Sequence, residues 1–187
     1  MKILRIYNNE TDLINKAIKN NKKAQQYLYD NYAPKMLSVC RYYIKDLQNA
    51  EATMLNGFFK VFTNLKHFKH QGSFEGWIRR IMVRESISFI RSQKRIEFSI
   101  DDVEYGNIST TTFETELEVN EIQQLIDELP EGYKLVFIMY AIEGYKHREI
   151  ASMLKISEGT SKSQLFKARK LLQQKIKNIN ITNNVAY

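Results

Sequence analysis

Apolar residues recur along most of this chain with the spacing of amphipathic helices. The clearest pattern comes from Met54, Phe58, Val61, Phe62 and Leu65, which fall at i, i+4, i+7, i+8 and i+11. This spacing places all five on one face of a helix. Such a face needs a core to cover it.

Three more helices are predicted in the same half of the chain. One is centred on residues 13–18, and a second runs from about 22 to 43, where Pro34 is expected to kink or divide it. A fourth helix is predicted from about 74 to 91. Its buried face is expected to hold Trp77, Ile78, Ile81 and Met82. A single cysteine, Cys40, falls within the second pattern and is expected to be an inert buried thiol.

The helical pattern fades near residue 96 and resumes near Val119. The residues between are typical of a linker, and a proline in the first turn of a new helix follows at Leu129–Glu131. Only 7 Gly and 2 Pro leave little material for the turns of a sheet protein. We therefore predict an all-α chain with two small helical domains, residues 1–95 and 119–187, joined by a linker at 96–118.

The charges divide along the chain in the same way. Residues 1–96 carry 18 Lys and Arg against 7 Asp and Glu, residues 97–128 carry 10 acidic residues and no basic ones, and residues 129–187 carry 10 basic against 4 acidic. The linker is therefore acidic. Two basic blocks suit a polyanion that is contacted at two places. The alternative is that these charges belong to solvated helix faces.

Residues 145–169 have the pattern of a helix-turn-helix. Ile150 and Leu154 give the first helix an inner face, Ile156 fills the turn, and Ser157 is a good N-cap for the second helix. The second helix is expected to bury Ser161, Leu165, Ala168 and Leu172.

That stripe leaves Lys162, Ser163, Phe166 and Lys167 pointing elsewhere. Cations suit phosphates, a hydroxyl suits a base edge or a phosphate, and an apolar ring can meet a thymine methyl group. These residues predict a DNA-recognition helix. For Phe166 the alternative is packing against Tyr145 or another domain.

The first domain has features suited to single-stranded nucleic acid. Arg80, Arg84 and Arg91 lie at i, i+4 and i+11 of the fourth predicted helix and form a basic rail for a phosphate backbone. The loop at 67–73 offers aromatic and polar groups that suit a flipped base. The alternative for Arg79 and Arg80 is a solvated face.

Both domains resemble the sigma-70 family of bacterial RNA polymerase sigma factors, in its extracytoplasmic-function (ECF) group. The run from Ile156 to Thr160, followed by Lys162 and Ser163, is similar to sigma region 4. Region 2 is matched by Asn49-Ala50-Glu51, Phe58, Lys60, Phe62, Phe68, Ser73-Phe74, Trp77-Ile78 and Arg80-Ile81.

The resemblance implies a sigma factor that directs promoter recognition, DNA opening and transcription initiation. The region 2 domain would dock on the clamp helices of the polymerase largest subunit and capture the minus-10 element as single strand. The region 4 domain would read the minus-35 element and touch the polymerase flap. An anti-sigma factor is also implied as a partner.

The resemblance assigns candidate residues to each of these roles. Polymerase contacts are expected at Asn49, Glu51, Asn56, Phe59 and Lys60. Minus-10 contacts are expected at Phe68, Lys69, His70, Arg80, Arg84 and Arg91. Minus-35 contacts are expected at Thr160, Lys162, Ser163, Phe166, Lys167 and Arg169.

Three positions depart from the family pattern. Ala52 and Leu55 stand where an aspartate and a glutamine are common in the polymerase-facing helix, and Arg84 stands where an asparagine is usual. These departures keep open a sigma-like decoy that acts by protein interaction alone. A stand-alone helix-turn-helix regulator is the other alternative.

The sequence contains no motif typical of an enzyme. It has no phosphate-binding glycine loop, no nucleophile elbow and no metal-ligand cluster, so no cofactor or metal is expected. The pair His67 and His70 lacks the further ligands that a metal site needs. The apolar runs are too short to cross a bilayer, and we expect a cytoplasmic protein.

Overall fold

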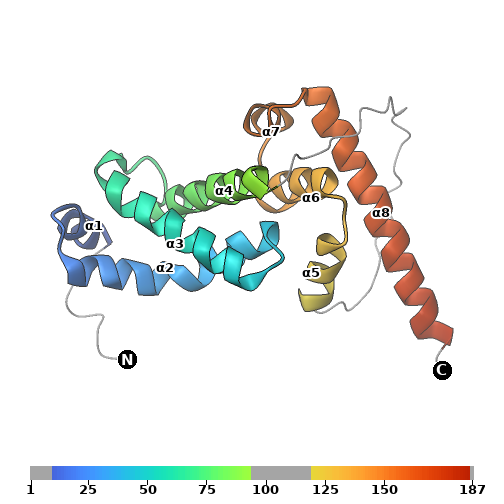
Figure 1. Cartoon of the computed structure of the whole chain (residues 1–187), viewed down its shortest axis with the longest axis horizontal. Helices are drawn as coiled ribbons and strands as arrows, with labels where there is room; N and C mark the ends of the chain where they lie inside the picture. Colours follow the sequence, from blue (N-terminus) through green and yellow to red (C-terminus); the bar gives the residue numbers. More distant parts are fainter. Residues whose placement is uncertain (1–9, 94–118, 186–187) are drawn as a thin grey trace. The chain divides into compact units, whose positions relative to one another are not determined.

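The computed structural model describes residues 10–93 and 119–185, and all regular structure within these residues is helical (Figure 1). The chain divides into two compact units, Met1–Gln93 and Lys94–Tyr187. The all-α class is therefore confirmed. The linker expected at 96–118 lies outside the described residues.

Within residues 10–93, the first unit contains four α-helices and one 3₁₀ turn. They are α1 (Glu10–Ile18), α2 (Lys22–Tyr43), α3 (Leu47–Asn64), η1 (Leu65–His67) and α4 (Phe74–Gln93). Side-chain caps fix where two of them begin. Asn21 Oδ1 accepts the backbone N–H of Ala24 at 3.0 Å, and Asp46 Oδ1 accepts that of Asn49 at 2.8 Å. Each cap satisfies an amide that has no partner within its helix.

The core of the first unit lies between α2, α3 and α4. Met54, Phe58, Val61 and Leu65 are all at most 5% exposed, as the apolar spacing predicted, while Phe62 is half-buried. On α4 the buried face holds Ile78 and Met82, both fully buried, but Trp77 and Ile81 are only half-buried. The prediction that α4 would bury all four of these residues is therefore wrong for Trp77 and Ile81.

Pro34 does not divide α2, which runs unbroken from Lys22 to Tyr43. Of the two expected effects, division of the helix at Pro34 is therefore wrong. Pro34 lies on the exposed side of the helix, where the carbonyl that loses its partner can be hydrated.

Cys40 is fully buried, as predicted. Burial raises the pKa of its thiol to about 11, and the charge of Glu85 adds to the effect while the neighbouring Ser86 side chain opposes it. The thiol form therefore predominates at neutral pH. Because the thiolate is the nucleophile, this residue is unreactive.

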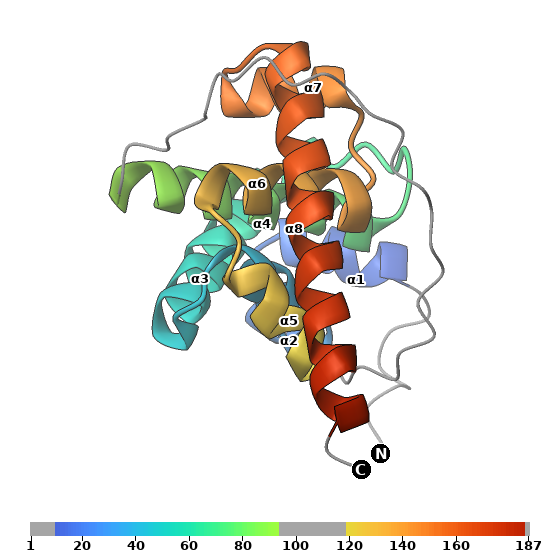
Figure 2. The same cartoon turned by 90° about the vertical axis from the view of Figure 1, so that its right-hand side faces the viewer.

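The second unit packs shorter helices along one long helix, α8 (Figure 2). Its elements are α5 (Val119–Asp127), α6 (Glu131–Phe137), the π-helical turn η2 (Ile138–Ile142), α7 (His147–Leu154) and α8 (Glu158–Val185). Leu135, Ile138, Met139 and Ile150 are fully buried at its centre. Gly144, with φ +75°, allows the left-handed turn that separates η2 from α7.

Candidate nucleic-acid and polymerase interfaces

A pocket of about 310 Å³ opens where the loop after η1 meets the first turns of α4. Its walls combine aromatic rings, amide and hydroxyl groups, and cations. They are formed by His67, Phe68, Lys69, Gln71, Gly72, Ser73, Gly76, Trp77 and Arg80. This volume is at the lower end of pockets that hold small molecules. The loop that was predicted to hold a flipped base therefore does form a concave, mixed-polarity site.

An aromatic cluster supports the pocket from inside the first unit. Phe68 is only 8% exposed, and its ring centroid lies 5.1 Å from that of Phe74 and 5.5 Å from that of Trp77. Phe74 is itself fully buried and stacks on Trp77 at 5.8 Å. Phe68 is therefore anchored in the core and contributes only part of its surface to the pocket.

The loop reaches its shape through two left-handed residues. His70 has φ 55° and Gly72 has φ 105°. The N–H of Gly76 then donates to Ser73 Oγ at 3.1 Å, which caps the start of α4. His70 does not line the pocket, because its ring packs against Phe68 at 4.6 Å. His70 was predicted to contact the minus-10 element; the pocket is lined instead by its loop neighbour His67 and by Trp77.

The three arginines of the predicted rail, Arg80, Arg84 and Arg91, are all exposed on α4. Arg80 also lines the pocket, so the rail begins at the pocket and continues along the helix. Arg79 is half-buried and takes part in other interactions. This order places the pocket directly beside a row of exposed cations.

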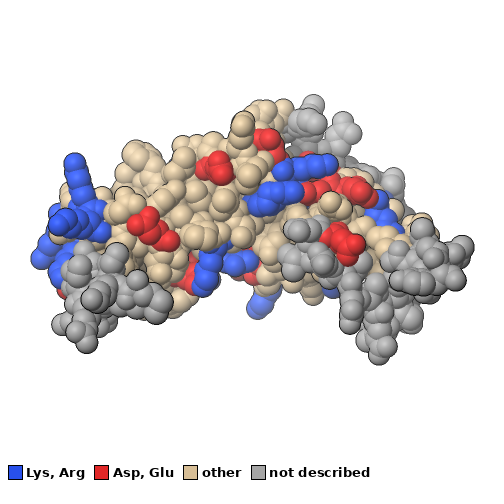
Figure 3. Space-filling model, turned by 90° about the horizontal axis from the view of Figure 1, so that it is seen from below, with Lys and Arg blue, Asp and Glu red and all other residues tan. Residues whose placement is uncertain are grey.

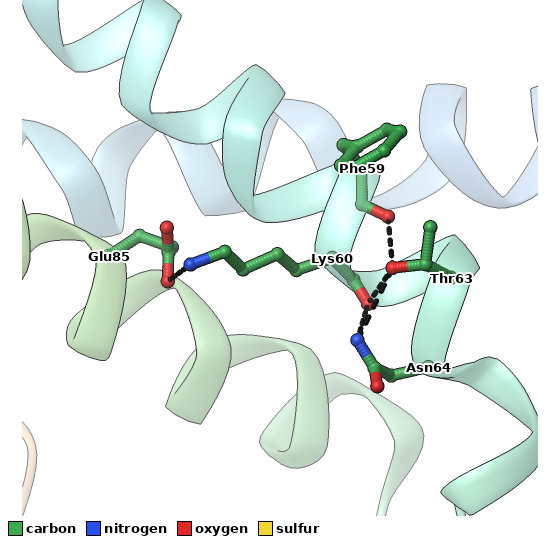
Figure 4. Close-up of polar contacts among 5 residues, drawn as sticks. All are labelled: Phe59, Lys60, Thr63, Asn64 and Glu85. Carbon is green, nitrogen blue, oxygen red and sulfur yellow. Dashed lines mark hydrogen bonds and ion pairs between the residues drawn. The ribbon is translucent and has the colours of Figure 1, made fainter.

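A different face of the first unit carries the predicted polymerase contacts on α3. All five of these residues are exposed: Asn49, Glu51, Asn56, Phe59 and Lys60. The ammonium of Lys60 lies 2.7 Å from a carboxylate oxygen of Glu85 on α4, and Figure 4 shows Phe59 pointing away from α4.

The second unit contains the predicted helix-turn-helix. The first helix, α7, ends at Leu154, and its C-cap Lys155 turns the chain left-handed with φ 56° and ψ 46°. Ser157 then caps α8, because its Oγ accepts the N–H of Thr160 at 2.9 Å. Ile150 and Leu154 are buried beneath this turn, as predicted.

The N-terminal part of α8 exposes some of the predicted DNA contacts and covers others. Ser161, Leu165 and Ala168 are buried, as expected, whereas Leu172 is half-buried. Five of the six candidate contacts are exposed or half-buried. Lys162 and Arg169 are exposed, and the half-buried ones are Thr160, Phe166 and Lys167.

Ser163 departs from the prediction. It was expected to point away from the buried stripe, but it is only 8% exposed. Its hydroxyl donates to the carbonyl of Thr160 at 3.0 Å, as a small side chain can do within a helix. The predicted exposed hydroxyl at this position is therefore wrong.

The sequence reasoning also missed a cluster that joins the two helices of the motif. The ring of His147 stacks on Tyr140 at 4.6 Å, and its Nδ1 lies 2.9 Å from Ser161 Oγ. The guanidinium of Arg169 lies 5.6 Å from the centre of the Tyr140 ring. Desolvation by burial lowers the pKa of His147, and Lys162 and Arg169 lower it further while Glu158 opposes them. No spacing rule marks such a cluster, because its members come from three elements.

Lysines also gather where α1 meets α2. Figure 3 shows this group at the left-hand end of the molecule, and Lys19, Lys22 and Lys23 are exposed there. The excess of Lys and Arg over Asp and Glu in residues 1–96 is consistent with a basic surface on this unit. The three lysines themselves belong to no recognisable motif.

Neither metal ligation nor membrane insertion is supported by the described residues. Within 10–93 and 119–185, no three His, Cys, Asp or Glu side chains are grouped so that they could hold a metal ion. None of the helices in these ranges is both long and apolar enough to cross a bilayer.

Comparison with known families matches both units. The family described as Sigma-70 region 2 matches residues 28–96, and Sigma-70, region 4 matches residues 120–172. Together the two matches cover well over half of the chain. They include the pocket loop, α3, α4 and the helix-turn-helix.

Individual relatives agree with the families. The chain is 26% identical to the ECF RNA polymerase sigma factor SigW of Bacillus subtilis, with 89% of this chain and 98% of the relative covered. It is 24% identical to the ECF RNA polymerase sigma-E factor of Haemophilus influenzae, with 88% and 93% covered.

Solved structures show the same fold. The sigma factor RpoE of Bartonella quintana, solved in complex with the anti-sigma factor NepR, superposes with a TM-score of 0.54 at 17% identity, covering 81% of this chain and 96% of that one. CnrH, solved with the cytosolic domain of CnrY, gives 0.51 at 16% identity, covering 89% and 96%. The chain therefore belongs to the sigma-70 family, as an ECF sigma factor, a non-enzymatic protein that acts in transcription initiation.

Proposed function

We propose that the two units divide promoter recognition between them. The first unit, corresponding to the predicted domain 1–95, docks on core polymerase and holds the minus-10 element as single strand. The second, within the predicted domain 119–187, reads the minus-35 element as duplex. The observation that carries this proposal is the pocket at the η1–α4 loop, because it adjoins the arginine rail on α4.

The pocket suits one base extruded from the stack. Extrusion costs a few kcal/mol, which stacking and hydrogen bonds in the pocket must offset. The half-buried ring of Trp77 supplies an aromatic surface, while Gln71 and Ser73 supply hydrogen-bonding groups. Lys69 and Arg80 add positive charge where a phosphate would follow the base.

The rail then guides the rest of the strand. Arg84 and Arg91 continue from Arg80 along the exposed side of α4 and contact successive phosphates by charge. Phosphate contacts fix the register of the strand, and the base in the pocket supplies sequence information.

The helix-turn-helix places the start of α8 in the major groove of the minus-35 element. Lys162 and Arg169 are exposed for phosphate or guanine contacts, and the ion pair of Lys162 with Glu158 at 2.9 Å is exposed enough for a phosphate to replace. Thr160, Phe166 and Lys167 lie beside them and complete the surface.

The remaining partners are proteins. The exposed face of α3 binds the clamp helices of the polymerase largest subunit, and the second unit touches the flap. An anti-sigma factor restrains the chain, a proposal supported by the two structural neighbours that were solved with such partners. We place the chain in the cytoplasm, where it would meet the polymerase.

Two alternatives make different predictions. A sigma-like decoy would bind core polymerase without opening DNA, and a stand-alone regulator would bind duplex DNA without polymerase. The pocket and the rail favour the sigma factor over both, because neither alternative uses a site for an unpaired base.

The test is DNA opening by the reconstituted holoenzyme. Core polymerase from the organism that encodes this chain is incubated with genomic fragments, with and without the chain, and unpaired thymines are mapped by permanganate oxidation. We expect opened sites that depend on the chain. Core binding without opening would favour the decoy.

A Trp77→Ala variant tests whether the pocket is involved. It should bind core polymerase as the wild type does and open fewer sites. As a matched control, Tyr42→Ala removes a half-buried aromatic ring from α2, away from the pocket. It should leave opening unchanged.

A further inference from the structure

The Tyr140 cluster consists of Tyr140, His147, Ser161 and Arg169, and its contacts start and end on α8. The ring of Tyr140, on η2, stacks on that of His147, at the start of α7, with 4.6 Å between the centroids and 23° between the planes. Nδ1 of His147 lies 2.9 Å from Ser161 Oγ on α8, and Figure 1 shows α7 beside the first turns of that helix. About two turns further along α8, the guanidinium carbon of Arg169 lies 5.6 Å from the centre of the Tyr140 ring.

The hydrophobic core does not account for the position of Tyr140. Its neighbours in sequence, Ile138 and Met139, are fully buried, whereas Tyr140 keeps 36% of its surface exposed. The π-helical turn widens the helix here, and the N–H of Glu143 donates to the carbonyl of Ile138 at 3.0 Å. Such turns are rare and are frequent at functional sites. Tyr140 is therefore held at the surface, where its ring meets a long side chain from α8.

Arg169 lies on the same face of α8 as Lys162, the other exposed cation among the candidate DNA contacts. Lys162, Phe166 and Arg169 stand at i, i+4 and i+7, which brings them to one side of the helix. The two cations are about 10 Å apart along the axis, at about 1.5 Å per residue. An arginine that rotates freely loses side-chain entropy when a partner fixes it. Because Tyr140 already restricts Arg169, less entropy remains to be lost when an anion binds.

The contact leaves the guanidinium able to bind an anion. A cation within about 6 Å of a ring centre is attracted to the face of the ring, and the N–H groups at the edge of a guanidinium can still donate to a phosphate. Burial lowers the pKa of His147, and the charges of Lys162 and Arg169 lower it further while Glu158 opposes them. At neutral pH the imidazole is therefore neutral, and it supports the tyrosine ring without repelling the guanidinium.

We propose that Tyr140 is a positioning residue for duplex DNA: its ring, supported by His147, holds the guanidinium of Arg169 where it binds a phosphate of the minus-35 element. This inference rests on the proposed function and adds a residue that lies outside the helix-turn-helix. Tyr140 acts through Arg169, and the contact it prepares is independent of the base sequence.

The experiment measures the affinity of the reconstituted holoenzyme for a duplex that carries a promoter opened by the wild-type chain. Tyr140→Leu removes the ring, whereas Tyr140→Phe keeps it, and Tyr140→Leu is also combined with Arg169→Ala. Tyr133→Leu is the matched control, because Tyr133 is a half-buried tyrosine on α6 that lies outside the Tyr140 cluster. Circular dichroism checks that every variant is folded.

We expect Tyr140→Leu to weaken binding about two- to fivefold, which is the range of an exposed cation–π contact. Tyr140→Phe and Tyr133→Leu should bind as the wild type does. In the Arg169→Ala background, Tyr140→Leu should cause no further loss, because the side chain that it positions is gone. The slope of log K against log salt should fall by about 0.9 in Arg169→Ala and stay unchanged in Tyr140→Leu, which keeps the charge.

An equal loss from Tyr140→Leu with and without Arg169 would overturn the inference, because it would assign Tyr140 a purely structural role. A loss that varied with the bases of the minus-35 element would overturn the phosphate contact. Wild-type affinity in Tyr140→Leu would overturn the inference and leave the proposed function intact. If replacing the whole minus-35 element did not weaken binding by the wild-type holoenzyme, the proposed function of the second unit would fail as well.

Discussion

The carboxylate of Asp127, at the end of α5, lies 2.8 Å from the ammonium of Lys134 on α6. Both side chains are buried, with 3% and 5% of their surface exposed, and the amide of Gln123 donates to the same carboxylate oxygen at 3.2 Å. The pair connects α5 to α6 across the turn at Pro130. It therefore holds the first two helices of the second unit together through charges that have little access to water.

Breaking this pair should destabilise the second unit strongly. Lys134→Met leaves a buried carboxylate without its cation, and such losses cost about 3–5 kcal/mol. The double variant Asp127→Leu/Lys134→Met removes both charges and should recover most of that loss. Urea unfolding, monitored by circular dichroism, measures the free energy of unfolding of both variants. A loss below about 1 kcal/mol in the single variant would show that the pair is not structurally important.

Gly57 should be required for the contact between α3 and α4. A Cβ at this position would overlap with Sδ of Met82, which is fully buried and cannot move into solvent. Overpacking costs about 1–3 kcal/mol, and the better helix propensity of alanine returns up to about 1 kcal/mol. We expect Gly57→Ala to lower the free energy of unfolding by about 1 kcal/mol, as measured by urea unfolding.

Two further variants test the cause of that loss. Gly57→Ala should cost less in a Met82→Ala background, because the clashing atoms are gone. Gly159→Ala serves as the control, since its Cβ would meet nothing closer than 3.6 Å. If Gly57→Ala cost the same with and without Met82, the close contact would not be the reason.

Arg84 should contribute charge to promoter binding. In the reconstituted holoenzyme, Arg84→Ala should lower affinity on all promoters and reduce the slope of log K against log salt by about 0.7–0.9. Arg84→Lys keeps the charge and should keep the slope. A loss confined to one promoter sequence would instead mean that Arg84 reads a base.

Acid should weaken the second unit through His147. Burial lowers the pKa of this imidazole, so the unfolded chain, with an ordinary pKa of about 6.5, binds a proton that the folded chain rejects. The contribution of His147 to the stability is therefore fully present above about pH 6.5, and it is lost as the pH falls through the lower folded pKa. His147→Phe keeps an aromatic ring against Tyr140 and removes the titration.

Urea midpoints between pH 7.5 and pH 5.5 provide the measurement. The wild type should lose more stability over this range than His147→Phe does. His70→Asn, in the other unit, is the control and should follow the wild type. Equal pH dependence in wild type and His147→Phe would exclude His147 as the cause.

Features set by neighbouring residues were predictable from the sequence. The Ser157 cap, the buried Ile150 and Leu154, and the α3 core stripe all depend on residues close together in the chain. Local spacing is sufficient for such elements, because a cap or an apolar face is defined within a few residues.

Features that depend on packing between elements were less predictable. An apolar stripe does not distinguish a core residue from a pocket wall, so Trp77 was assigned to the core although it lines the pocket. His70 was placed in the site because it belongs to the loop, but its ring packs on Phe68. Ser163 was expected to be exposed, yet only 8% of its surface remains exposed once the helices of the second unit have packed. In each case, the position of the side chain depends on which residues pack around it, and local spacing in the sequence does not show this.

The most direct test of the central claim is run-off transcription with core polymerase from the source organism on a library of its genomic fragments, with and without this chain. The account predicts new start sites that require the chain and share two upstream motifs at a fixed spacing, one for each unit. The result that would contradict it is the absence of any chain-dependent start site while the same polymerase, supplied with its main sigma factor, remains active.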